Sequence, residues 1–291
     1  MTDTGVRAVD AAAAIDYTTY TTPGPLTDLA EIPSAQFDDL PHDPLAISGL
    51  ASGLVIQPWE AEHLKLALPS ARFEEKNLRP AAELIRALLA LSPEPLTTAR
   101  PPERRLVGTC RHFATLTCAL LRYRGIAARA RCGFATYFEP GKGLDHWITE
   151  YWHEAERRWV WIDSEILHKE ILKRPEDLAE GEFLTGGEAW AAYRRGEIDA
   201  ATFGVGGTPN WGPAEIRGNA MRDLASLNKV ETLPWDEWGR MAASYRGETG
   251  PDYDELLDTI AATCAGDDPR AIAELYAREE LRVPDSLLSP H

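Results

Sequence analysis

The chain has 291 residues, of which 44% are hydrophobic and 26% are charged, a balance typical of a protein that buries a large core without disulfide bonds. Its 46 acidic residues against 30 lysines and arginines give a net charge of −16, which disfavours nucleic acid and anionic membranes as partners. No stretch is long and apolar enough to span a membrane, no secretory signal pattern opens the sequence, and the four cysteines show no paired spacing. These features predict a cytoplasmic protein with reduced thiols.

The first third of the sequence divides into an irregular segment and a helical segment. Residues 1–45 are rich in Thr, Pro, Ala and Asp and predict extended or poorly ordered chain. From residue 45 to residue 91 the apolar residues follow a helical period, with Pro58 at the start of one predicted helix. Leu84, Ile85 and Leu88 mark the buried face of another.

The middle of the chain changes from helix to strands. A predicted helix begins at Gly108 or Thr109 and ends near Tyr123, where Gly125 supplies the usual stop. Three segments with an alternating or β-rich pattern follow, at residues 126–138, 146–152 and 158–163. This order predicts a helix followed by an antiparallel meander.

Helical patterns return after residue 163. They cover residues 186–196, 214–228, 234–245 and 267–280. Helices, then strands, then helices predict an α+β fold.

Three residues of the middle section have the chemistry of a thiol nucleophile with its base. Cys110 opens the predicted helix, whose N-terminal dipole favours a thiolate. A histidine can take the thiol proton and a carboxylate can hold the imidazole, and His146 and Asp163 sit on successive strands. A hairpin turning near residues 154 and 155 would place His146 directly opposite Asp163, on the same face of the sheet.

Each of these residues has a structural alternative when it is taken alone. A cysteine on an apolar helix face is usually a packing residue, and this is the interpretation we give to the other three cysteines, Cys118, Cys132 and Cys264. His112 is close to Cys110 in sequence but points to a different side of the helix, so we expect it to cap the helix or face solvent. The same geometry excludes a zinc site, and we predict no metal and no cofactor.

Positive charge is concentrated around the predicted nucleophile. Between residues 96 and 133 there are eight arginines and one acidic residue, Glu103. These arginines either form ion pairs with the acidic remainder of the chain or make the pocket around Cys110 electropositive.

The motifs in this section are similar to the core of the transglutaminase-like superfamily, which includes transglutaminases, microbial thiol peptidases and peptide N-glycanases. The matching segments are GTCRHFATLTCALLRYRGIAARARCGF, DHWITEYW and RWVWID, within residues 104–165. The resemblance implies that Cys110 is the nucleophile, His146 the base and Asp163 the orienting carboxylate. Ser164 stands where many members have proline, and no counterpart is visible for the tryptophan that stabilises the oxyanion in transglutaminases.

The resemblance implies an α+β fold with a papain-like core, in which the nucleophile-bearing helix packs on an antiparallel sheet. The predicted units are residues 1–45, a catalytic core at residues 46–170, and a mainly helical region at residues 171–291 packed on that core.

The implied activity is acyl transfer through a thioester, on a small-molecule or peptide amide, ester or thioester. Amide hydrolysis is slightly favoured over an amide-forming acyltransferase, and a non-catalytic binding protein on the same fold is the further alternative. Arg111, Trp147 and Trp161 are the predicted substrate contacts, each with a structural alternative on the helix surface or in the core. The sequence sets no oligomeric state.

Overall fold

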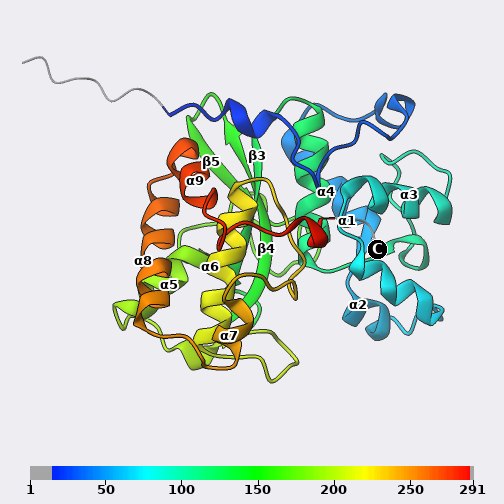
Figure 1. Ribbon diagram of the computed structural model, residues 1–291. Coiled ribbons are helices and arrows are strands. Elements are labelled where there is room, and N and C mark those ends of the chain that lie inside the picture. Colours follow the sequence, from blue (N-terminus) through cyan, green and yellow to red (C-terminus); the bar gives the residue numbers. More distant parts are fainter. Residues whose placement is uncertain (1–14, 289–291) are drawn as a thin grey trace, which may run out of the picture.

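The computed structural model describes residues 15–288. Its central element is a β-sheet that has helices packed on both faces (Figure 1). Helix α4 and the N-terminal helices lie on one side of the sheet, and helices α5, α6, α8 and α9 lie on the other. Each side has its own hydrophobic core. The α+β fold class predicted from the sequence is confirmed.

The N-terminal part of the chain wraps the core on the α4 side. Two 3-10 turns, at Thr18–Thr21 and Ser34–Phe37, bury Tyr20 and Phe37. Phe37 joins the core on the α4 side, whereas Leu26 joins the core on the other side. The helices that follow are α1 (Pro44–Leu54), α2 (Pro58–His63) and α3 (Ala81–Leu91). Residues 1–14 of the predicted irregular segment lie outside the described residues, and the division of the chain at residues 45 and 170 stays a prediction.

Helix α4 (Cys110–Tyr123) begins and ends where the sequence predicts. Thr109 caps its N-terminus in a capping box, and the Thr109 backbone N–H donates to His112 Nδ1 at 3.0 Å. Gly125 follows the helix with a φ of 73°, a left-handed conformation that glycine adopts without steric cost. All residues from Cys110 to Arg122 are buried, because α4 lies between the sheet and the N-terminal helices.

The five-stranded sheet carries the predicted meander at its centre. Strands β3 (Ala128–Ala135), β4 (Gly143–His153) and β5 (Arg158–Ile162) are antiparallel neighbours. Strand β6 (Phe183–Thr185) adds to β3, and β7 (Phe203–Gly204) pairs in parallel with the start of β4.

The register of the hairpin between β4 and β5 differs from the prediction by two residues. Thr149 pairs with Ile162 and His153 with Arg158, so the turn holds four residues, with Arg157 at a φ of 51°. His146 is therefore not directly opposite Asp163. The shift is an even number of residues, so it does not exchange the two faces of the sheet.

The C-terminal region is helical, as predicted, with two differences. The helix expected at residues 234–245 is limited to α7 (Met241–Tyr245), and α8 (Pro251–Ala265) was not predicted. The other helices are α5 (Gly186–Arg194), α6 (Pro213–Leu227) and α9 (Pro269–Tyr276). Helix α6 packs against β3 and brings its polar residues to the same end of the sheet as Cys110.

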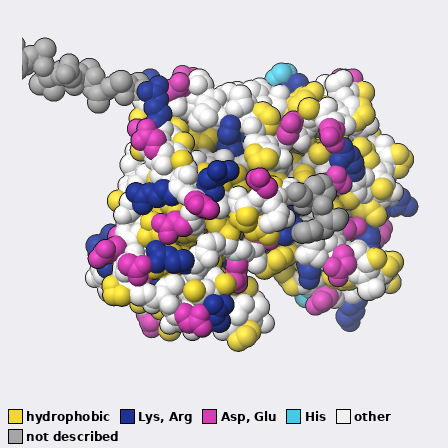
Figure 2. Space-filling view, in the orientation of Figure 1, with side chains coloured by type: hydrophobic (Ala, Val, Ile, Leu, Met, Phe, Trp, Pro, Cys, Tyr) yellow, Lys and Arg dark blue, Asp and Glu magenta, His cyan; other side chains and the backbone are white. Residues whose placement is uncertain are grey.

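Three of the eight clustered arginines serve the fold through buried ion pairs. Arg122 contacts Glu231 at 2.8 Å, and Arg131 contacts Asp223 at 2.7 Å. Arg129 contacts Glu150 at 2.6 Å. Charges of both signs are also interspersed over the face shown in Figure 2. The ion-pair interpretation of the arginine excess is therefore the correct one for these residues.

Among residues 15–288, no helix is long and apolar enough to cross a membrane. The cytoplasmic location stays a prediction.

Candidate active site

A short parallel pairing delivers the chain to the start of α4. Strand β1 (Val55–Ile56) pairs with β2 (Leu106–Val107), and the Gly108 backbone N–H donates to Ile56 O at 2.9 Å. This pairing places Gln57 beside the turn that carries Cys110. Both residues line a cavity of about 1020 Å³.

His146 lines the same cavity and is in contact with Asp163. The Nε2 atom of His146 lies 2.8 Å from Asp163 Oδ2, and the two residues are only 3% and 1% exposed. The Cys110 thiol also lies close enough to the His146 ring for the imidazole to oppose the rise in the thiol pKa. Because Nε2 faces the carboxylate, Nδ1 is the ring nitrogen left for the sulfur. The structure therefore brings the three predicted catalytic residues into contact.

Asp163 is held by three donors. Besides His146, Tyr137 Oη donates to Oδ2 at 2.5 Å and the Glu165 backbone N–H donates to Oδ1 at 2.9 Å. Burial alone would raise the pKa of Asp163, but the His146 charge and these hydrogen bonds hold it below its usual value. Asp163 is thus a carboxylate fixed in one orientation.

The same contacts set the protonation of the thiol and the imidazole. Burial opposes a charged imidazole, but the Asp163 carboxylate raises the pKa of His146 well above its usual value. Burial raises the pKa of the Cys110 thiol, while the hydrogen bond and charge of His146 oppose that rise. Proton transfer from the thiol to His146 is the step that this arrangement favours.

The other cysteines have no such partner. All four cysteines are free and buried, and burial raises the pKa of Cys118 and of Cys264 to about 12. Cys132 is also held as a neutral thiol by burial. These three thiols are packing residues in the two cores.

The predicted substrate contacts lie outside the cavity that contains Cys110. The Arg111 guanidinium is fully buried and donates to the backbone oxygen of Glu231. Trp147 packs in the core beside α4, and Trp161 stacks edge-on against Phe183 and lines a separate cavity of about 570 Å³. We therefore assign none of the three to the substrate.

His112 is a capping residue, as predicted, but it does not face solvent. Its side chain is fully buried, with Nε2 3.1 Å from Leu78 O. Burial and the neighbouring Arg111 charge lower the pKa of His112 to about 3, so it is neutral at physiological pH. Its task is to hold the turn that presents Cys110.

Sequence reasoning missed several residues that line the site. Gln57, Asp145, Glu165 and Glu215 come from four separate segments of the chain. Asp145 and Glu165 are neighbours of predicted residues in sequence, which is a weak signal. For Gln57 and Glu215 the sequence offers no signal, because only tertiary packing brings them to Cys110.

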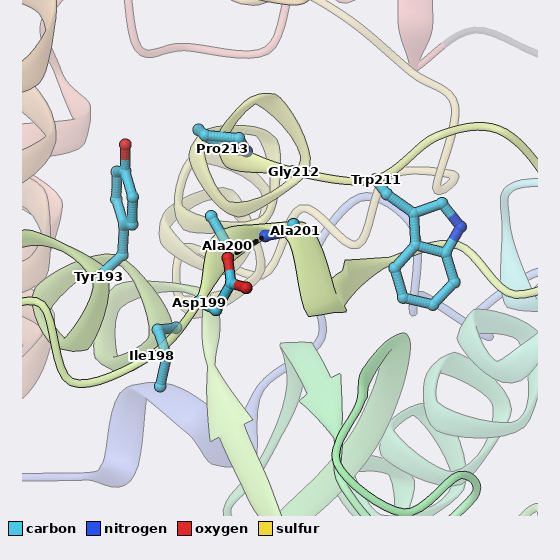
Figure 3. Close-up of a pocket in the computed structure, with 8 residues that line it drawn as sticks. All are labelled: Tyr193, Ile198, Asp199, Ala200, Ala201, Trp211, Gly212 and Pro213. Carbon is cyan, nitrogen blue, oxygen red and sulfur yellow. Dashed lines mark hydrogen bonds between the residues drawn. The ribbon is translucent and has the colours of Figure 1, made fainter.

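The cavity near α5 in Figure 3 is lined by no cysteine or histidine of the described chain, unlike the cavity that contains Cys110. Its volume is about 540 Å³, and its walls run from Tyr193 and Asp199 to Trp211 and Pro213. Asp199 accepts a hydrogen bond from the Ala201 backbone N–H at 3.0 Å and so caps a short turn. Within residues 15–288, no group of three or more histidine, cysteine or acidic side chains is arranged to hold a metal ion.

The start of α4, strand β4 and the residue after β5 supply Cys110, His146 and Asp163. Residues 92–164 match the model of the transglutaminase-like superfamily. The resemblance is confirmed over this segment, which supports a thiol enzyme at the level of the superfamily.

Two further comparisons add little. No curated protein matches the chain. A crystal structure of a candidate cysteine protease from Cytophaga hutchinsonii is similar at 19% sequence identity with a TM-score of 0.34. The similarity covers 56% of this chain and 45% of that one.

Tyr137→Phe tests how the Tyr137 hydroxyl stabilises the Asp163 carboxylate. Loss of the hydroxyl removes one hydrogen bond to a buried charge, so we expect the free energy of unfolding to fall by about 1.5–3 kcal/mol. The pKa of Asp163 will rise, and the midpoint of acid unfolding, followed by circular dichroism, will move to higher pH. Tyr123→Phe, on the exposed end of α4, is the control. Equal midpoints in the two variants would contradict the assigned role.

Proposed function

We propose that this protein is a thiol enzyme that transfers acyl groups through a thioester on Cys110. Its substrate is a small-molecule or peptide amide, ester or thioester, and amide hydrolysis is slightly favoured. The observation that carries the proposal is the meeting of Cys110 and His146 at one cavity of about 1020 Å³, with the Asp163 carboxylate 2.8 Å from His146 Nε2.

Acylation begins with transfer of the thiol proton from Cys110 to His146 Nδ1. The thiolate attacks the substrate carbonyl, and the imidazolium, stabilised by Asp163, then protonates the leaving group. The bond to the leaving amine or alcohol breaks, and the acyl group remains on the sulfur as a thioester.

Two donors are available for the oxyanion that forms during the attack. The Cys110 backbone N–H is the first of helix α4 and has no acceptor within the helix. The Gln57 side chain lines the same cavity and uses one amide hydrogen to bind Glu165 Oε2 at 2.7 Å. Its second amide hydrogen supplies the other donor that the sequence left unnamed.

Deacylation uses the same groups in reverse. His146 takes a proton from an incoming water or amine as it attacks the thioester, and returns that proton to the Cys110 sulfur. Water gives hydrolysis and an amine gives a new amide. The alternative function, an amide-forming acyltransferase, therefore needs no other residue of the site.

Selective alkylation tests the nucleophile. With limiting iodoacetamide at pH 6, we expect mass spectrometry to find Cys110 labelled at least about tenfold faster than the other three cysteines, which lack a proton acceptor. Equal labelling of Cys110 and Cys118 would overturn the proposal and leave the non-catalytic binding protein in its place.

The fate of the acyl-enzyme separates the two activities. After brief treatment with p-nitrophenyl acetate, the acetyl group on Cys110 is offered water alone or a set of primary amines. Rapid loss to water without acceleration by amines supports a hydrolase. A thioester that is stable in water and consumed only by amines supports the acyltransferase.

A further inference from the structure

The walls of the Cys110 cavity are acidic, although the chain segment around Cys110 is basic. Five carboxylates line the cavity, from Glu139, Asp145, Glu165, Glu215 and Glu237. Arg222 is the one arginine or lysine among the lining residues. This excludes the alternative of an electropositive pocket, because none of the eight clustered arginines lines the cavity.

Two of the five carboxylates already have a cation. Glu139 pairs with Lys142 at 2.7 Å, and Glu165 lies 3.9 Å from Lys169. Asp145, Glu215 and Glu237 form no ion pair with any residue of the described chain. Glu237 is exposed at the rim, whereas Glu215 is only 6% exposed and Asp145 is half-buried.

Asp145 and Glu215 are held in place by neutral donors. The Asn219 amide donates to Asp145 Oδ1 at 2.7 Å, and the Tyr245 hydroxyl donates to Glu215 Oε2 at 3.1 Å. Each carboxylate keeps a second oxygen without a hydrogen-bond partner among the described residues. Carboxylates with a free oxygen in a cavity wall are suited to bind a cation.

Arg222 organises this pair without neutralising both members. Its Nη1 atom contacts Asn219 Oδ1 and Tyr245 Oη, each at 3.2 Å, and its Nη2 atom donates to Asp236 O. The guanidinium thus fixes the two neutral donors and supplies one positive charge. One charge cannot balance two carboxylates, so a negative charge remains in the cavity.

We propose that the substrate carries an ammonium or guanidinium group close to the reacting carbonyl, bound between Asp145 and Glu215. This inference rests on the proposed function, because it places the cation beside the carbonyl that Cys110 attacks. Trp235 also lines the cavity and is 44% exposed, so its ring face is open to the same cation or to the apolar stem that carries it.

The pKa shifts of the groups that line the site agree with this proposal. Burial raises the pKa of Asp145 and of Glu215, and the Arg222 charge offsets this rise only in part. The Asp145 and Glu165 charges also raise the pKa of Cys110. A bound cation would reduce both effects, so the correct substrate would make the thiolate easier to form at the moment it is needed.

Three thiol reagents of different charge test whether the wall of the cavity is negatively charged. We compare methanethiosulfonates bearing a trimethylammonium-ethyl, a methyl or a sulfonatoethyl group, each rate at Cys110 being divided by its rate with a free model thiol. We expect the cationic reagent to react at least about 100-fold faster than the anionic one, the size of effect that two carboxylates within about 6 Å produce even at the dielectric constant of bulk water, about 80. Asp145→Asn and Glu215→Gln should each lower this ratio about fivefold to tenfold.

The matched control removes a carboxylate elsewhere. Glu255 lies exposed on α8, outside the cavity lining, so Glu255→Gln changes the net charge by the same amount. If this variant lowers the ratio as much as Asp145→Asn, the general charge of −16 explains the preference and the proposal is overturned. Equal normalised rates for the three reagents overturn it as well.

A binding measurement separates this inference from the proposed function. The Cys110→Ala variant is titrated with the N-acetyl methylamides of lysine, norleucine and glutamate, and the shift in melting temperature is recorded. Stabilisation by the lysine derivative alone, reduced by Glu215→Gln, supports the cation site whether or not Cys110 is reactive. Equal shifts for lysine and norleucine overturn the cation site even if Cys110 proves to be the nucleophile.

Discussion

Replacing His146 by alanine will slow the alkylation of Cys110 by iodoacetamide at least about tenfold at pH 7. Without the imidazole, burial and the carboxylates of the cavity act unopposed on the thiol and raise its pKa. Each unit of that rise lowers the thiolate fraction about tenfold. The loss in any acyl-transfer reaction will be larger, about 10²- to 10⁴-fold, because the general acid and base are lost as well. Labelling rates measured by mass spectrometry give the first number directly.

His153→Ala is the matched control, because His153 lies on the same strand and its side chain is 37% exposed. It should label at the wild-type rate. Cys118 serves as an internal monitor, since its burial leaves it unlabelled unless the protein unfolds. The difference between His146→Ala and wild type should shrink as the pH is raised, when the thiol ionises without help. Equal rates for both variants at pH 7 would remove His146 from the mechanism.

The catalytic residues could be predicted from the sequence because their signals are local. A capped helix start, a glycine stop and β-rich segments place Cys110, His146 and Asp163 on defined elements. The superfamily resemblance then assigned their roles. The error of two residues in the hairpin register did not disturb this prediction, since an even shift keeps side chains on the same face.

The walls of the cavity could not be predicted in the same way. Asp145 and Glu215 are 70 positions apart and meet through Asn219, on the same helix α6 as Glu215, and Tyr245, on α7. The net charge of the segment around Cys110 was a poor guide to the charge of the cavity for the same reason, because tertiary packing decides which side chains line it. The arginine-rich segment made an electropositive pocket a reasonable alternative, but none of its eight arginines lines the cavity, and three of them form buried ion pairs with partners as distant as Asp223 and Glu231. Composition gives the number of charges, whereas packing decides which of them face the cavity.

Asp163→Ala will reduce the free energy of unfolding by about 3–5 kcal/mol, the range measured when one partner of a buried ion pair is removed. The substitution leaves three buried donors without their acceptor, on His146, Tyr137 and the Glu165 backbone. Asp163→Asn keeps the shape and one acceptor oxygen, so its loss of stability will be smaller. Urea denaturation at pH 6 measures both values. A loss below about 1 kcal/mol for Asp163→Ala would show that the charge network contributes little to the fold.

The stability difference between wild type and Asp163→Asn will also depend on pH in a defined direction. The pKa of Asp163 is lowered in the folded protein, so its contribution is present above the unfolded value of about 3.9 and is lost as the pH falls. The pKa of His146 is raised, so its contribution is complete below about 6.5 and is lost as the pH rises through the folded value. The difference should therefore be largest between about pH 4 and 6.5 and should narrow toward pH 9. A difference that stays constant from pH 5 to 9 would mean that His146 is neutral in the folded protein over this range.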